Sequence, residues 1–152
     1  MLQTDLPPYL TTLVLELGQR KLLLPNTAVA EISLLRSLQA AEHAPDWLLG
    51  NVEWRGIELP VISFSRLAGE EQQLDEQTRM VVINAVSAPD KLRFFAISIN
   101  AVPRSLRVDP GLAAQPEQQL GPYEDAAVML NGQLYYIPRL AAIEKLLLSG
   151  MA

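Results

Sequence analysis

The residue types that most often carry catalysis or bind metals are sparse in this chain. Its 152 residues include one histidine, His43, and no cysteine. His43 has Glu42 and Asp46 nearby, but a zinc site needs three or four ligands drawn from cysteine, histidine and carboxylates. Since this loop offers no second imidazole or thiol, a solvated histidine is the better interpretation, and we expect no metal site.

Carboxylates gather at one place, in the stretch that holds Glu70, Glu71, Asp75 and Glu76. Paired carboxylates perform acid–base chemistry when their environments separate their pKa values. Here the neighbours are glutamines, which favours a hydrated linker. The chain also lacks the G-x-S-x-G elbow, the phosphate-binding loop and the dinucleotide fingerprint. The sequence therefore predicts a protein that is not an enzyme and holds no cofactor.

Charge and hydropathy exclude further classes of function. The net charge of −5 argues against a nucleic-acid groove, which needs clustered lysine and arginine. The only adjacent basic pair, Arg20–Lys21, lies at a predicted turn and is read as solvated. No run reaches the roughly 18 apolar residues of a membrane span, and the N-terminus has no signal-peptide pattern. We expect a cytoplasmic protein with no direct membrane insertion.

The stretch Gly50–Gly69, GNVEWRGIELPVISFSRLAG, organises the chain. A turn at Arg55–Gly56 leads into a strand predicted over Ile57–Phe64, whose alternate residues are apolar. Pro60 lies inside that strand, and because proline has no N–H to donate it predicts an edge strand or a bulge. Ser65–Gly69 then predicts a short helical turn. Arg55 is expected to be exposed.

The remaining pattern consists of short strands separated by turns. Glycine signals predict hairpins at Gly18–Gln19 and Asn131–Gly132. We expect eight to ten strands and one terminal helix opened by Pro138, which favours a small barrel or a sandwich. The stretches with strand patterns are 12–17, 21–24, 57–64, 80–86, 93–99, 106–108, 127–130 and 133–137, whereas 27–32 fits either a helical turn or the start of a strand.

The domain organisation follows from length and composition. Residues 1–10 are expected to form a loose tail, and residues 11–152 a single domain. The polar stretch 70–78 is the best candidate for a connection between two halves of the fold. The proline-containing stretch 109–125 is expected to be a long loop.

The stretch Gly50–Gly69 and the pattern around it resemble the CheW family of chemotaxis coupling proteins, and the resemblance extends from Leu13 to about Leu148. The family pattern is Gly-Val-x-x-x-Arg-Gly-x-x-x-Pro followed by two apolar residues. The tryptophan before the arginine is similar to variants that serve type IV pilus, or twitching motility, chemosensory systems. The matching residues are Gly50, Val52 (one place later than the usual valine), Arg55, Gly56, Pro60, Val61 and Ile62.

The resemblance implies a mainly β fold. It consists of two small five-stranded SH3-like β-barrels packed on a shared core, with a C-terminal helix and a changeover near residues 70–78. It also implies a non-catalytic adaptor that couples the cytoplasmic tip of a methyl-accepting chemoreceptor to the regulatory domain of a CheA-type histidine kinase, at polar receptor arrays. Two alternatives stay open: a divergent CheW-like protein that binds and modulates the kinase only, and a small-ligand-binding β-barrel protein.

Arg55 is the first candidate site residue. A turn arginine is usually just solvated, but arginine is also enriched at interface hot spots, and the resemblance implies receptor contact. Trp54 is either core or an anchor beside Arg55, with core slightly favoured, and Gly56 completes the turn. The resemblance implies that Val29, Glu31 and Ile32 border a receptor groove between the barrels, with Ile99 and Val102 on the opposite wall.

The sequence departs from the family pattern at three places. Ser63 and Asn100 stand where many members carry aspartate, and the usual aspartate before the last helix is replaced around Pro138. These departures indicate a divergent member. They leave the predicted fold intact and bear on which receptor and kinase it meets.

Overall fold

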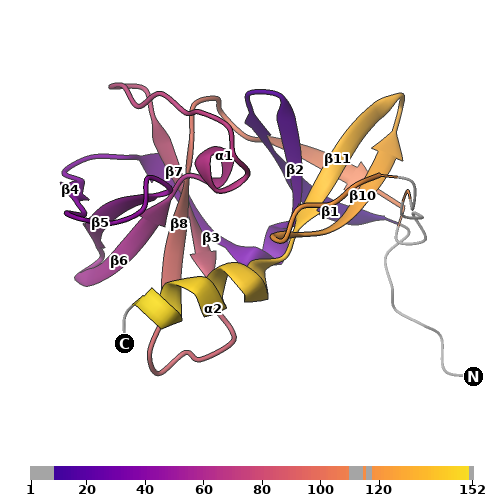
Figure 1. The fold of residues 1–152 in the computed structure, drawn as a ribbon. Helices are drawn as coiled ribbons and strands as arrows, with labels where there is room; N and C mark the ends of the chain where they lie inside the picture. Colours follow the sequence, from indigo (N-terminus) through magenta and orange to yellow (C-terminus); the bar gives the residue numbers. More distant parts are fainter. Residues whose placement is uncertain (1–8, 110–114, 116–117, 151–152) are drawn as a thin grey trace, which may run out of the picture.

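The chain forms two β-sheets that lie side by side, with helix α2 (Leu140–Gly150) running below them (Figure 1). The computed structural model describes residues 9–109, 115 and 118–150. The five-stranded sheet has the order β10-β11-β2-β1-β9. Its strands are β1 (Leu10–Leu17), β2 (Arg20–Pro25), β9 (Arg104–Val108), β10 (Glu124–Leu130) and β11 (Gln133–Pro138).

The six-stranded sheet has the order β3-β7-β8-β6-β5-β4. The 3-10 turn η1 (Asn26–Ala28) enters it, and the short helix α1 (Phe64–Leu67) follows β6. Its strands are β3 (Val29–Leu34), β4 (Gln39–Ala40), β5 (Leu48–Trp54), β6 (Ile57–Ile62), β7 (Arg79–Asn84) and β8 (Phe94–Ile99).

The predicted hairpin turns are confirmed. Gly18 has φ +58° between β1 and β2. The loops Arg55–Gly56 and Asn131–Gly132 have positive φ at both residues, +51° and +76° in the first and +50° and +79° in the second. Two positive φ values define the type I′ turn, whose twist matches that of the paired strands.

Three apolar clusters hold the molecule together. The largest lies between the two sheets and takes Ile143 and Leu147 from α2. Each sheet also encloses a smaller cluster of its own, around Val52, Leu59 and Val82 in the six-stranded sheet and around Val14 and Leu23 in the other. The expected mainly β fold of two small barrels on a shared core is confirmed, with the two-residue β4 as an additional strand.

The chain crosses between the sheets at residues 25–29 and again at 99–104. The stretch 70–78 instead joins α1 to β7 within the six-stranded sheet, so the predicted changeover does not coincide with a crossing. The cause is the parallel pairing of β6 with β8, in which Val61 lies opposite Ala96. This pairing keeps both sides of the linker in one sheet. Residues 1–8 of the predicted tail and residues 110–114 and 116–117 of the predicted loop lie outside the described residues, whereas β1 already begins at Leu10 and β10 at Glu124.

Two proline predictions need correction. β6 lies between β5 and β8, so Pro60 is not on an edge strand. Pro60 is tolerated because it pairs only with Asn51 of β5, and pairing with β8 starts one residue later; the irregularity is in β5, between Leu48 and Gly50. Pro138 ends β11, and α2 begins two residues later at Leu140.

The 70–78 linker is anchored by a buried amide, not fully hydrated. The side-chain oxygen of Gln72 accepts hydrogen bonds from the hydroxyls of Ser63 and Ser98, the latter at 2.8 Å. Its amide nitrogen donates to Asn100 Oδ1 at 2.9 Å. Ser63 and Asn100, two of the three departures from the family pattern, therefore meet at the same glutamine.

Candidate partner-binding site

Arg55 stands at the tip of the β5–β6 hairpin, and its side chain is 68% exposed. Its Nη2 donates to Glu31 Oε1 at 2.6 Å, and its Cζ lies 4.8 Å from the centroid of the Trp54 ring. An exposed arginine held by two neighbours has lost part of its rotamer freedom before any partner arrives. That lowers the ordering cost of an interface contact.

Of the two roles predicted for Trp54, core residue or exposed anchor, the structure supports the core role. It is buried in the apolar cluster of the six-stranded sheet and packs edge-on against Phe94, with ring centroids 4.9 Å apart. Its indole N–H is buried without a hydrogen-bond partner among the described residues. Trp54 therefore supports Arg55 from below, while Gly56, next to it in the turn, is exposed.

A β-bulge decides where the β3 candidates point. In a regular strand, residues three apart face opposite sides. The register with β7 shifts between Val29 and Glu31, so that Val29 lies opposite Ile83 and Ile32 opposite Val81. Ile83 and Val81 both belong to the core shared by the sheets, and cross-strand partners lie on the same face. Val29 and Ile32 therefore face the shared core side, where Ile32 stays 37% exposed.

Glu31 lies on the other face of β3, opposite Val82 of the inner cluster. There it lines a polar groove of about 900 Å³ that also borders Trp54, Arg55 and Gly56. We call this the edge groove, because it separates the free edge of β3 from β4 and β5. Its charged residues are Glu31, Arg36, Glu53, Arg55 and Glu58.

The structure does not bring together Ile99 and Val102, which were predicted to form the groove wall opposite β3. Ile99 is fully buried in the shared core, so its predicted receptor contact is wrong: β8 turns it inward together with Phe95 and Ile97. Val102 is 66% exposed in the connection between β8 and β9. The candidate site thus has a polar part around Arg55 and a separate apolar part at Val29 and Ile32.

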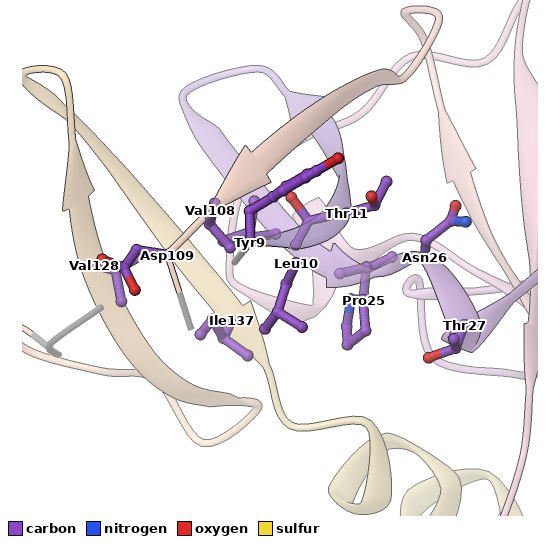
Figure 2. A pocket seen from close by; sticks show the side chains of 13 residues that line it. Tyr9, Leu10, Thr11, Pro25, Asn26, Thr27, Val108, Asp109, Val128 and Ile137 are labelled. Carbon is purple, nitrogen blue, oxygen red and sulfur yellow. The ribbon is translucent and has the colours of Figure 1, made fainter. Parts of the chain in front are cut away.

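A second cavity opens at one end of the five-stranded sheet, where β1 begins and β2 and β9 end (Figure 2). It measures about 490 Å³ and is mainly apolar, with Leu10 45% exposed beside it. We call it the end cavity. Its lining residues are Tyr9, Leu10, Thr11, Thr12, Leu23, Leu24, Pro25, Asn26, Thr27, Val108, Asp109, Val128 and Ile137.

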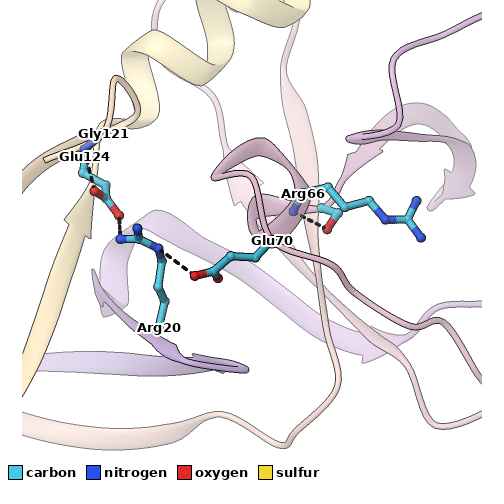
Figure 3. Close-up of polar contacts among 6 residues, drawn as sticks. Arg20, Arg66, Glu70, Gly121 and Glu124 are labelled. Carbon is cyan, nitrogen blue, oxygen red and sulfur yellow. Dashed lines mark hydrogen bonds and ion pairs between the residues drawn. The ribbon is translucent and has the colours of Figure 1, made fainter.

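Arg20 is a residue whose role the sequence concealed. It forms an ion pair with Glu124, which is buried, and its Nε lies 3.7 Å from a Glu70 carboxylate oxygen (Figure 3). Its Cζ also lies 4.7 Å from the Tyr136 ring centroid. Arg20 therefore ties β2 and β10 to the segment after α1, across the two sheets. Because Arg20 lies beside a hairpin turn, the sequence predicted that it is solvated, and nothing in the neighbouring residues indicated its pairing with Glu124.

The described residues offer no metal centre. They contain no group of three or more His, Cys, Asp and Glu side chains arranged to hold a metal ion. His43 is exposed, with φ +57°. The hydrogen bond that Arg104 donates to the Tyr135 hydroxyl raises the pKa of Arg104. Within the described part of the chain, no helix has the length and apolarity needed to cross a membrane.

Comparison with known proteins gives one family and one fold. A family model described as "CheW-like domain" matches residues 11–146. No curated protein matches the chain. Among solved structures, the scaffolding protein TtCheW from Thermoanaerobacter tengcongensis is similar, with a TM-score of 0.76 and 15% sequence identity over 92% of this chain and 90% of that one. At this identity the structural match establishes the fold.

Proposed function

The chain belongs to the family of CheW-like domains, non-catalytic scaffolds of chemotaxis signalling, and on this premise we propose that it couples a receptor to a kinase. The receptor partner is the cytoplasmic tip of a methyl-accepting chemoreceptor. The kinase partner is the regulatory domain of a CheA-type histidine kinase. The complex would lie in the cytoplasm, at polar receptor arrays.

The arrangement of Arg55 is the observation that best supports receptor coupling. Its guanidinium is exposed, positioned by Glu31 and Trp54, and carried on a turn whose left-handed conformation is costly for arginine. Asparagine or glycine would suit that turn better. A costly residue at an exposed tip indicates a role other than stability.

Receptor contact would use both faces near β3. The apolar tip of a receptor helical hairpin would meet Val29 and the exposed Ile32, as in other helix-in-groove interactions. Arg55 and Glu31 would supply directed hydrogen bonds from the adjacent edge. Signalling then means that the receptor's state changes how well the pieces fit, which is a differential binding effect.

Kinase contact is assigned to the end cavity. This cavity is apolar, lies at the end of a barrel and leaves Leu10 exposed, as suits a docking point for a second barrel end. We expect an interface of about 1,200–1,600 Å² in total. Micromolar binding, roughly −8 kcal/mol, would suffice because arrays add multivalency.

The end cavity also favours a second candidate function, binding of a small apolar ligand. Its volume and apolar lining fall within the range of ligand pockets. A kinase-only modulator is a third candidate, because the departures from the family pattern bear on which receptor and kinase the protein meets. For the pathway we propose pilus motility, since Trp54 precedes Arg55.

Calorimetric titration with the regulatory domain of the kinase from the same organism is the first test. Saturable micromolar binding supports the adaptor, and Leu10→Asp should weaken it without unfolding the protein. Kinase binding without any binding of the receptor tip would favour the kinase-only modulator. Absence of kinase binding by a folded sample would reject the coupling role and favour the small-ligand candidate.

A further inference from the structure

The four sheet edges of the described structure differ in how well they are protected. An exposed strand edge invites pairing with another chain unless it is short, covered or charged. β4 has two residues, β9 carries two arginines, and the outer edge of β10 is met by Gln115, whose N–H donates to Ala127 O. β3 has six residues, a bulge at its start and one charge, Glu31.

The hydrogen-bond pattern identifies which β3 groups are free. The N–H of Leu35 donates to Thr78 O at 2.9 Å, so it points toward β7. Backbone direction alternates along an antiparallel pair. Glu31 and Ser33 therefore also bond to β7, while Ile32 and Leu34 direct their N–H and C=O groups outward. No hydrogen bond to these outward groups exists among the described residues.

The edge groove lies directly beside these free groups. Its lining is mostly polar, and β5 forms its far wall. Glu31 and Arg55 form an ion pair at one end of the groove, so their charges cancel. The remaining charged residues are the two glutamates Glu53 and Glu58 and one arginine, Arg36, which gives the groove a net negative charge. With a chain charge of −5, this groove suits a basic occupant.

We propose that β3 accepts an extended segment of a partner protein as an added strand, in which lysine alternates with β-branched residues. Main-chain hydrogen bonds at Ile32 and Leu34 supply affinity. The β-branched side chains lie on the face of Glu31 and Ser33, toward the apolar cluster of the six-stranded sheet. The lysines lie on the face of Ile32 and reach Glu53 and Glu58, which share that face because they alternate with Val52, Trp54 and Leu59 of the cluster. This contact goes beyond receptor and kinase coupling and does not depend on it.

The test titrates the 152-residue protein with the peptide acetyl-Thr-Val-Lys-Val-Lys-Val-Thr-amide and follows the binding by NMR. Strand addition predicts saturable changes in the amide chemical shifts of β3 at millimolar peptide concentration or below. It also predicts that amide hydrogen exchange at Ile32 and Leu34 slows by about tenfold or more, because the free groups become hydrogen-bonded. The matched edge, β9, should keep its exchange rates.

Two controls separate strand addition from other binding. Replacing both peptide lysines by glutamate should weaken binding at least about fivefold, because the groove is acidic. Leu34→Pro removes one outward N–H and leaves the ladder with β7 intact, so it should reduce peptide affinity; if this variant does not fold, the exchange rates of the unchanged protein decide.

Three outcomes would overturn the proposal. The first is no saturable binding at millimolar peptide. The second is binding without protection of Ile32 and Leu34. The third is concentration-dependent dimerisation of the free protein that already protects these amides, which would make the occupant a second copy of this chain.

Discussion

Replacing Arg55 by asparagine should separate binding from stability. The variant loses the exposed ion pair with Glu31, worth about 0.2–1 kcal/mol. It also loses the contact over Trp54, worth about 0.5–1 kcal/mol at an exposed site. In return, the left-handed conformation that costs most residues about 1–2 kcal/mol suits asparagine better. These opposing effects are of similar size, so the free energy of unfolding should change by less than about 1 kcal/mol.

Receptor affinity should respond differently. If Arg55 is an interface hot spot, its loss costs more than about 1.4 kcal/mol of binding, which is tenfold in Kd. Urea unfolding measures the first quantity, and titration of the receptor tip measures the second. Kinase binding should persist, because the end cavity lies in the other sheet.

Arg93→Asn is the matched control. Arg93 is also exposed and also lies over an aromatic ring, at 5.5 Å from the Phe94 centroid, but it does not border the edge groove. This variant should change neither receptor nor kinase affinity. The reasoning on Arg55 is refuted if Arg55→Asn lowers the unfolding free energy by more than about 2 kcal/mol, or if its receptor affinity equals that of Arg93→Asn.

Three further substitutions test contacts that stabilise the fold, each by urea unfolding. Gly50→Ala should destabilise by more than about 2 kcal/mol, because φ is +146° and the new Cβ would lie 2.0 Å from a carbonyl oxygen of β4, whereas Gly121→Ala, whose Cβ would make only ordinary contacts, should be nearly neutral. Gln72→Leu should cost about 1–3 kcal/mol, because the buried Ser63 hydroxyl loses its acceptor while the Ser98 hydroxyl keeps only its bond to Ile62 O, and an unchanged midpoint would contradict the network. Arg20→Ala should cost at least about 2 kcal/mol because the buried Glu124 loses its only cationic partner among the described residues and keeps only the hydrogen bond from the Gly121 N–H; a loss below about 0.5 kcal/mol would show the pair to be unimportant.

Local features of the fold were predictable from the sequence. The hairpins at Gly18 and at Asn131–Gly132 depend on two or three neighbouring residues, and turn chemistry is local. The alternation that places Phe95, Ile97 and Ile99 on one face also survives in the structure. That alternation already indicated a core position for Ile99, and the family resemblance wrongly assigned it to a groove wall.

The non-local features were not predictable. Parallel pairing of β6 with β8 joins residues more than thirty positions apart, with no turn to mark it. The bulge after Val29 reverses which face Ile32 occupies, and single-residue shifts leave no compositional trace. Arg55 was predictable as exposed because its turn was recognisable, whereas its pairing with Glu31 required the tertiary fold.

The order of the strands along the chain has a consequence for folding. The six-stranded sheet comes from one uninterrupted stretch, residues 29–99, while the five-stranded sheet joins residues from both sides of it, with Leu10 opposite Val108. Closing so long a loop costs entropy before any contact repays it. The six-stranded sheet should therefore form first and the two chain ends zip together upon it, so pulse-labelled amides of β7 and β8 should gain protection before those of β1 and β9.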